Sequence, residues 1–326
     1  MAIVAGTFVT TDAIGLREDL QDAIYDISPL DTPLLSMAKK LKAKARFHEW
    51  NTDILLAAGN NRQIEGDDYS YSTPTPTVRV GNYCQISRKT VVVSNTMQAV
   101  DKAGRGEELA YQVMKQGREL KRDMEFALVR VQASSAGNNG LSRSSAGLES
   151  WLSSNWTTAT GSSGSPATPG FSSGTVAAPT DATVAATFIE PDLKAAIQEC
   201  WSVGGQPSVI MCGPFNRQKL SAFAGNATKT LNWNGADPGA IVASAGIYVS
   251  DFGKFKVISN RFQRDRTVFM LDPDYLGVAY LRPISMTKPA ITGDAEKSAL
   301  VAEYCLVVQN EAAHSKLVDL TTSGAI

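Results

Sequence analysis

The chain has 326 residues, of which 43% are hydrophobic and 19% charged, as is typical of folded proteins with ample apolar material for a core. At this length two subdomains are expected, since single cores rarely grow beyond about 250–300 residues. With 31 basic and 32 acidic side chains, the formal net charge is -1. Proteins that bind nucleic acid through many phosphate contacts carry a basic excess, so any contact with nucleic acid is predicted to be weak or local.

The cysteines show no spacing typical of a metal site or a redox motif, because no C-x-x-C pair occurs. Each is flanked by apolar or small residues, which predicts buried free thiols in a reducing cytosol. The four positions are Cys84, Cys200, Cys212 and Cys305.

Candidate catalytic residues are sparse. His48 and His314 are the only histidines, which argues against a histidine-based metal site, and both are predicted to be surface or packed residues. No G-x-S-x-G motif is present. Residues 251–253 spell Asp-Phe-Gly but lack the accompanying kinase motifs, so they predict a turn. We therefore predict a protein that is not an enzyme, with no catalytic, cofactor-binding or metal site.

The sequence carries no recognisable targeting or membrane signal. Residues 1–15 lack a positively charged region followed by a long apolar run, and no window approaches about 18 uninterrupted apolar residues. We expect neither a secretory signal nor a membrane span, and a protein made and kept in the cytosol.

Residues 1–45 are predicted to form an N-terminal arm. Apolar residues at helical spacing between 16 and 27 precede two prolines, and 34–38 predict a further helical turn. The basic run 39–46 is interpreted either as a charged surface or strand start, or as a patch that contacts nucleic acid or an acidic neighbour. As a candidate inner-surface patch it comprises Lys39, Lys40, Lys42, Lys44 and Arg46.

Residues 46–94 predict an extended β-hairpin. The segments 46–51 and 83–91 alternate polar and apolar residues, as half-buried strands do. Residues 56–78 between them are too polar and proline-rich for a core, and loops this long in compact proteins are usually functional. The acids here lack the spacing of an EF-hand, so a solvated tip is favoured over a calcium site. The tip residues expected to contact another subunit are Arg62, Glu65, Asp67, Asp68, Tyr69 and Tyr71.

A long helix is predicted over 107–132, because apolar residues recur there in steps of three and four. Its apolar face is expected to pack against strands near 301–308. Gly117 in its interior costs up to about 1 kcal/mol relative to alanine, which suggests a close approach of another backbone.

The remaining segments predict a change of architecture along the chain. Residues 138–186 are rich in Gly, Ser, Thr, Ala and Pro and predict a surface excursion, which we group with the helix in a subdomain over 95–186. Residues 187–285 combine short helices with apolar strands and predict a separate α/β unit. Residues 286–326 predict strands that return to the subdomain of the long helix.

This order of segments resembles the major capsid proteins of tailed bacteriophages of the Hong Kong 97 type. Several short sequence segments resemble those of one subfamily of phage head proteins: residues 13–20, 27–29 with 32–33, 48–50 and 213–216. The resemblance covers nearly the whole chain. It implies an α+β fold with an N-terminal arm, an E-loop over 46–94, a P-domain built on a spine helix, and an A-domain over 187–285.

The resemblance also implies a function and partners. The expected function is self-assembly into the icosahedral head, as hexamers and pentamers, around packaged double-stranded DNA. Scaffolding, decoration and portal proteins are expected as further partners, and DNA as a weak, non-specific one. The protein is expected in the virion after assembly in the bacterial cytoplasm. The alternatives are an encapsulin-like nanocompartment shell and, last, a cytosolic α/β enzyme.

Overall fold

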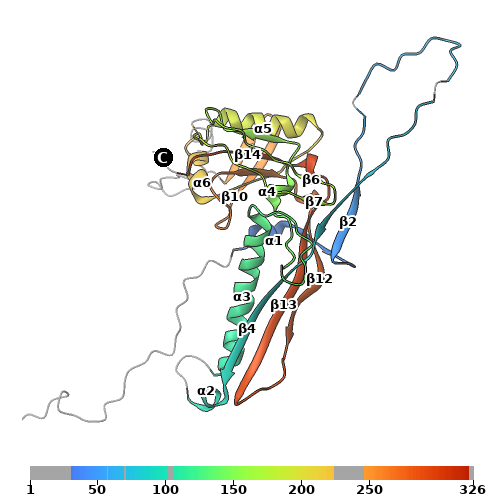
Figure 1. Ribbon diagram of the computed structural model, residues 1–326. Coiled ribbons are helices and arrows are strands. Elements are labelled where there is room, and N and C mark those ends of the chain that lie inside the picture. Colours follow the sequence, from blue (N-terminus) through green and yellow to red (C-terminus); the bar gives the residue numbers. More distant parts are fainter. Residues whose placement is uncertain (1–30, 57, 70, 102–105, 224–245, 323–326) are drawn as a thin grey trace, which may run out of the picture.

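The protein combines two sheets with helices and one long projecting segment, and the α+β class predicted from the sequence is confirmed (Figure 1). The structure is a computed structural model that describes residues 31–56, 58–69, 71–101, 106–223 and 246–322. Residues 1–30, which hold most of the predicted arm and its predicted helix, lie outside the described residues.

The first sheet has the strand order β1–β12–β13–β4 and lies beside helix α3 (Figure 1). Its strands are β1 (Lys39–Lys42), β12 (Leu276–Thr287), β13 (Ala295–Val308) and β4 (Gln85–Ser94). The short helix α1 (Pro33–Met37) packs on α3, and α2 (Asn95–Ala99) follows β4. Only β1 and β12 run parallel; the other neighbours are antiparallel.

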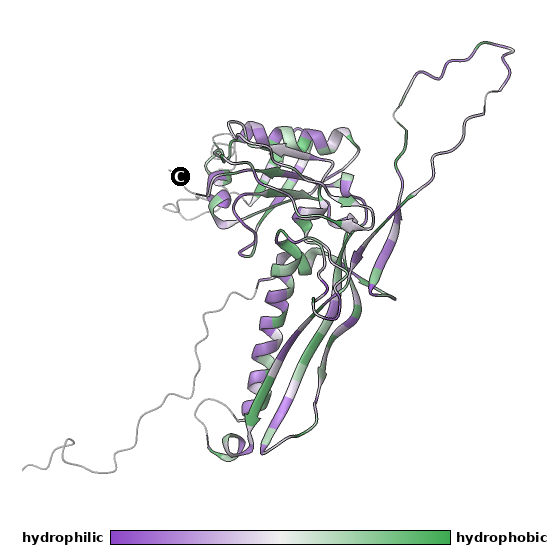
Figure 2. Cartoon of the chain, viewed as in Figure 1, coloured by the Kyte–Doolittle hydropathy of each residue, from purple (hydrophilic) through white to green (hydrophobic). Residues whose placement is uncertain are grey.

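Helix α3 (Glu108–Val129) covers most of the range 107–132 in which a helix was predicted. Its buried side chains share one core with alternate residues of β13, as the sequence predicted. In Figure 2 the strands beside the helix are mostly hydrophobic, while much of the visible helix surface is hydrophilic. The contributing residues are Leu120, Met124, Leu128 and Val129 from the helix and Leu300, Ala302, Tyr304 and Leu306 from the strand.

The expected close approach of a backbone to Gly117 is wrong. A Cβ built at this position would meet only Leu300 Cδ1, at an ordinary contact distance of 3.8 Å. The glycine therefore carries the entropic cost of a flexible residue in a helix without a packing reason. We expect Gly117→Ala to raise the free energy of unfolding by about 0.5–1 kcal/mol. Urea unfolding checks this, and a destabilised variant would show that the helix needs the glycine.

Glu125 of the long helix is fully buried, although glutamate side chains are usually exposed. One carboxylate oxygen accepts from Leu34 N at 2.8 Å, and the other accepts from Leu35 N at 2.9 Å. Asn260 Nδ2 donates to the first oxygen at 2.6 Å. Burial raises the pKa of this carboxyl group. Glu125 thus joins the start of α1, the long helix and the loop after β10 (Gly253–Ser259).

The second sheet has the order β5–β14–β11–β8–β10–β9. Its other strands are β5 (Trp156–Thr158), β14 (Ser315–Val318), β11 (Val268–Leu271), β8 (Val209–Cys212) and β9 (Ile247–Ser250). Helices α5 (Glu190–Ser202) and α6 (Pro214–Ser221) contribute Leu193, Ile197 and Leu220 to a second core with this sheet. Two 3-10 turns, η2 (Pro273–Tyr275) and η3 (Glu311–Ala313), precede β12 and β14.

The two sheets exchange strands in a way that the order of segments did not predict. β12 was placed in the α/β unit, but it pairs with β13 beside the long helix. β14 was expected to return to that subdomain, but it pairs with β11 and β5 in the second sheet. Each strand joins the sheet whose core buries its apolar side chains. Leu276 and Val278 of β12 enter the core of α3, whereas Leu317 of β14 enters the second core.

The predicted surface excursion 138–186 is built into the body to a large extent. It contributes α4 (Leu148–Trp151), β5 and the small hairpin of β6 (Phe171–Ser172) and β7 (Thr175–Val176). Arg264 forms ion pairs with Glu149 and with Asp181, the latter at 2.7 Å. These ion pairs, together with burial of much of α4, hold two points of the excursion against the second sheet.

His314 is a packed residue, one of the two alternatives that the sequence analysis allowed. Its Nδ1 accepts from Asp272 N at 3.1 Å, and burial lowers its pKa to about 4. The unfolded chain, with a histidine pKa of about 6.5, binds a proton that the folded state does not bind between these values. The free energy of unfolding should therefore fall as the pH drops from about 6.5 towards about 4.

We expect this histidine to remove about 2 kcal/mol of stability between about pH 8 and about pH 5. Urea unfolding of the natural protein and His314→Asn at both pH values measures the effect. The asparagine amide oxygen can still accept from Asp272 N, so the variant isolates the proton. Equal pH dependence of the two proteins would contradict the prediction.

Candidate functional site

The segment between β2 (Phe47–Thr52) and β3 (Val78–Tyr83) projects away from both sheets (Figure 1). β2 and β3 pair antiparallel from Phe47↔Tyr83 to Thr52↔Val78. A projecting hairpin was predicted, but its second strand was placed at 83–91. That strand, β4, belongs instead to the sheet beside α3, because the chain leaves the hairpin at Cys84.

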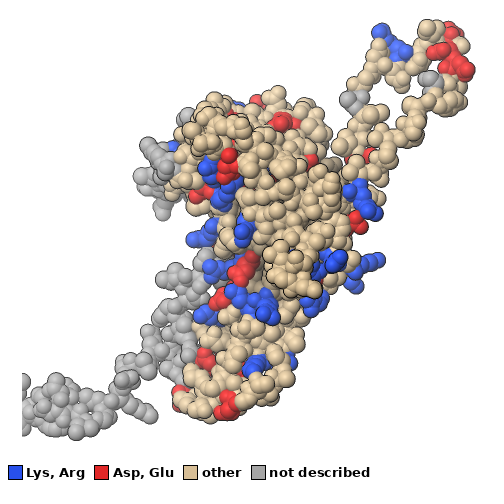
Figure 3. All heavy atoms as spheres, in the orientation of Figure 1, with Lys and Arg blue, Asp and Glu red and all other residues tan. Residues whose placement is uncertain are grey.

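The tip of this hairpin is exposed along its described length. Its described residues form local hydrogen bonds: Asp67 N donates to Ile64 O at 3.1 Å, and Arg62 Nε donates to Asn60 Oδ1 at 3.1 Å. Figure 3 shows basic and acidic side chains on the projecting end. All six predicted contact residues are exposed: Arg62, Glu65, Asp67, Asp68, Tyr69 and Tyr71.

Large apolar side chains on the projection have no cover within the subunit. Tyr71 is 93% exposed and Leu55 is 92% exposed. Ile54, Leu56, Ile64 and Tyr69 are also exposed, so apolar groups extend along both sides of the loop. Residues 54–56 were not selected from the sequence. Clustered apolar surface of this kind marks interaction sites in soluble proteins.

The base of the hairpin, unlike its tip, is held firmly. Asn82 is fully buried, and its Nδ2 donates to Leu306 O at 2.8 Å and to Ser145 Oγ at 3.1 Å. Its Oδ1 accepts from Ala146 N at 2.9 Å. Trp50 of β2 contacts Trp151, with 5.3 Å between the ring centroids. A fixed base therefore carries a tip that has no partner of its own.

The face of the first sheet away from α3 is also uncovered along β4. Val91 and Val93 are buried towards the helix, so the alternating residues Ile86, Arg88 and Val92 point to the other side and are exposed. On β13 the carboxylate of Glu303 lies between Arg143 at 2.5 Å and Arg282 at 2.8 Å. This outer sheet face is apolar with a basic excess.

The residues of the predicted basic patch are exposed, but some of them are also built into the fold. Lys39–Lys42 form strand β1 beside β12, and Lys39 Nζ pairs with Asp274 at 2.9 Å. The other four side chains of the patch are exposed and form no ion pair with any described residue: Lys40, Lys42, Lys44 and Arg46. The predicted arm therefore cannot extend to residue 45 as a free segment, because α1 and β1 are part of the body.

A sequence profile of the SU10 major capsid protein family matches residues 3–321, nearly the whole chain. The chain belongs to this family. A major capsid protein of Escherichia phage Phieco32 is 40% identical over 127 residues, which cover 39% of this chain and 36% of that relative. The alignment with this curated relative thus spans about a third of its length.

Solved structures share the fold of this capsid-family chain. The capsid asymmetric unit of cyanophage A-1(L) covers 96% of the chain, and the chain covers 98% of it, with a TM-score of 0.64 and 11% identity. The holo-SrpI encapsulin complex of Synechococcus elongatus PCC 7942 covers 96% of the chain and is covered to 99%, with a TM-score of 0.54 and 10% identity. The fold therefore occurs in phage and encapsulin shells, while the family match favours the phage capsid.

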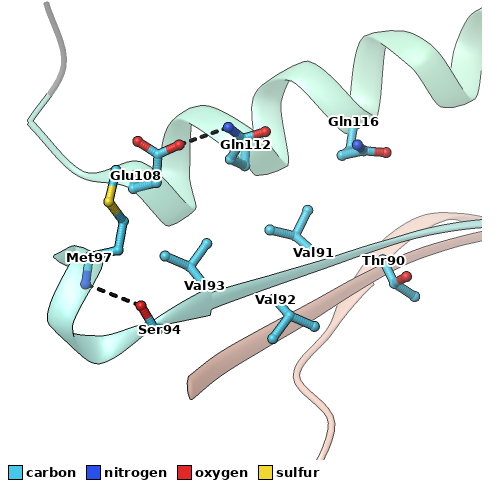
Figure 4. Close-up of a pocket in the computed structure, with 9 residues that line it drawn as sticks. All are labelled: Thr90, Val91, Val92, Val93, Ser94, Met97, Glu108, Gln112 and Gln116. Atoms are coloured by element: carbon cyan, nitrogen blue, oxygen red, sulfur yellow. Dashed lines mark hydrogen bonds between the residues drawn. The ribbon is translucent and has the colours of Figure 1, made fainter. Parts of the chain in front are cut away.

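One hollow of this capsid-family chain lies between the start of α3 and β4, with a volume of about 380 Å³ (Figure 4). Val91 and Val93 line one side, and Gln112 and Gln116 project from the helix opposite. Gln112 Nε2 donates to Glu108 Oε1 at 2.7 Å. The rest of the lining includes Ser94 and Met97.

The described part of the chain shows neither a metal-binding cluster nor a membrane-spanning helix. It contains no group of three or more His, Cys, Asp or Glu side chains placed to hold a metal ion. None of its helices has the length and apolar character needed to cross a membrane.

Proposed function

We propose that this chain is the major capsid subunit of a tailed phage and assembles with copies of itself into the icosahedral shell around double-stranded DNA. The observation that carries the proposal is the projection 53–77, which exposes tyrosine and aliphatic side chains that its own subunit does not cover. A second copy supplies the missing cover. The family match supports the same conclusion, and it supports a structural role rather than an enzymatic one.

The tip has a candidate receptor on the neighbouring copy. Residues 62–71 include one basic side chain, Arg62, and three acidic ones, Glu65, Asp67 and Asp68, so the tip is acidic. The outer sheet face offers Arg88 beside exposed Ile86 and Val92, so both charge and apolar character are complementary. We propose that the tip of one subunit covers this face of the next. Many moderate contacts of this kind allow misplaced subunits to be released and corrected during assembly.

The domain limits of this proposal follow the sheets. The E-loop is the hairpin of β2 and β3, the P-domain is α3 with the four-stranded sheet, and the A-domain is the six-stranded sheet with α5 and α6. The excursion 138–186 belongs partly to the A-domain, because β5 is one of its strands.

The exposed lysines of the basic patch are proposed to contact DNA weakly at the inner wall. With a formal net charge of -1, the chain lacks the basic excess that would hold packaged DNA tightly. Scaffolding, decoration and portal proteins complete the proposed set of partners. The structure of phage G, which shares the fold with a TM-score of 0.55, includes decoration proteins.

Sedimentation and negative-stain imaging of the purified full chain test the proposal. Capsomers or shells are expected. A protein that stays monomeric at high concentration, with and without the other virion proteins, would overturn it. An encapsulin-like shell is the second candidate because of the shared fold. Particles that contain a co-purified enzyme cargo instead of DNA would favour that alternative.

A further inference from the structure

Cys84 and Cys305 face each other across two neighbouring strands. β13 and β4 pair antiparallel, and the last matched residues at this end are Tyr304 and Gln85. One step further along the same register brings Cys305 opposite Cys84. Directly opposed residues of antiparallel strands have Cα atoms about 4.5–5.5 Å apart. Disulfides span Cα separations of about 4.4–6.8 Å, a range that includes this spacing of opposed strand residues.

The two sulfur atoms are already in contact. The Sγ atoms lie 3.5 Å apart, and both side chains are fully buried. They must close to about 2.05 Å to form a bond, a change that small side-chain rotations supply. Ala43, Ala279 and Val307 enclose the pair. Beside it, the exposed residues 44–46 form the outer cover, and Cys84 N donates to Arg46 O at 2.8 Å.

We propose that Cys84 and Cys305 are a redox modification site, and that hydrogen peroxide converts the two thiols into an intramolecular cross-strand disulfide. In the first step one thiolate sulfur attacks a peroxide oxygen and the O–O bond breaks, which gives a sulfenic acid and hydroxide. The hydroxide takes up the proton that the thiol had released and becomes water. In the second step the other thiol displaces water from the sulfenic sulfur. Overall two thiols and one hydrogen peroxide give one disulfide and two waters, with two electrons passing from sulfur to oxygen.

The surroundings favour this pair over the other cysteines. The hydrogen bond between the two thiols lowers the pKa of Cys84, whereas the same hydrogen bond and burial raise the pKa of Cys305. Cys84 is therefore the member of the pair that supplies the thiolate. Burial raises the pKa of Cys200 and of Cys212 to about 12, so both remain protonated and unreactive.

The bond would act at the root of the projecting hairpin. Cys84 is the residue between β3 of the hairpin and β4 of the first sheet, and Cys305 lies in β13. A disulfide here ties the exit of the hairpin to the sheet covalently. The reduced protein can form it after it leaves a reducing compartment. This inference does not depend on the proposed function, since it concerns a single subunit.

Treatment of the native full-length protein with hydrogen peroxide, followed by thiol blocking and non-reducing tryptic mapping, tests the proposal. The expected product links the peptides 80–88 and 298–316, which contain Cys84 and Cys305. The intact subunit should lose about 2 Da, and dithiothreitol should reverse the loss. The thermal unfolding midpoint should rise on oxidation and return on reduction.

Cysteine variants show whether the disulfide requires this pair of residues. The double variant Cys200→Ala/Cys212→Ala should form the same link, whereas Cys305→Ala should form none. If Cys305→Ala does not fold, the peptide map of the natural protein still decides. The proposal is overturned if the native protein shows no 80–88/298–316 link, gains oxygen on separate cysteines instead, or forms the link only after unfolding in urea.

Discussion

Deleting residues 60–76 and joining Gly59 to Thr77 is expected to leave a folded subunit that forms neither capsomers nor shells. The described tip makes hydrogen bonds only within itself, and its side chains are exposed, so the core loses nothing. The free energy of unfolding should stay within about 0.5 kcal/mol of the natural value. Assembly should be lost, because the apolar and acidic groups proposed to cover the neighbouring sheet face are gone. Urea unfolding and sedimentation measure the two effects separately.

A variant of equal length separates contact from reach. Replacing residues 60–76 by a Gly/Ser segment keeps the length of the loop but removes its side chains, and it should also fail to assemble. Shells from either variant would show that the tip is not an assembly contact. An unfolded deletion variant would show that the tip packs on its own subunit.

Helix α3 and the short elements of the second sheet could be predicted because each carries its own local signal. Apolar residues that recur in steps of three and four within 107–132 form one apolar face of a helix, and that face packs against β13. The apolar run 208–212 could only be a buried strand, and the structure forms β8 there. Local periodicity therefore locates elements well.

Strand partners could not be predicted, because alternation reports that one face is buried but not against which sheet. β4 alternates as an outer hairpin strand would, yet it lies beside α3. β14 lies near the C-terminal end of the chain and is buried throughout, yet its neighbours are β11 and β5. These pairings join residues between 45 and 219 positions apart, which a window of a few residues does not contain.

The sequence located the candidate site correctly, but it did not identify all of the residues that form it. The polar tip was visible from its prolines, acids and tyrosines. Residues 54–56 were missed, because an apolar run next to a strand looks the same whether its own subunit or another copy buries it. The burial of Glu125 was equally hidden, since its partners Leu34 and Leu35 contribute backbone N–H groups that every residue possesses.

Replacing Glu125 by glutamine is expected to lower the free energy of unfolding by about 2–4 kcal/mol. The carboxylate offers two acceptor oxygens to the backbone N–H groups of Leu34 and Leu35 and to Asn260. The glutamine amide keeps one acceptor oxygen, but its NH2 group then lies next to an N–H donor with which it cannot form a hydrogen bond. The relief of a buried charge, which shows in the raised pKa of Glu125, offsets only part of this loss.

Urea unfolding measures the loss, and hydrogen exchange locates it, since the amides of Leu34 and Leu35 should exchange faster in the variant. Glu119→Gln on the same helix is the matched control. Glu119 lies 3.7 Å from Lys89, which keeps its closer partner Asp123 at 2.8 Å. That change should cost less than about 0.5 kcal/mol, as surface ion pairs usually do. If both variants were equally stable, the buried carboxylate would not be what holds α1 on the long helix. A large loss confined to Glu125→Gln would mean that one side chain of α3 sets the position of the chain entering β1, and with it one edge of the sheet that the neighbouring tip is proposed to cover.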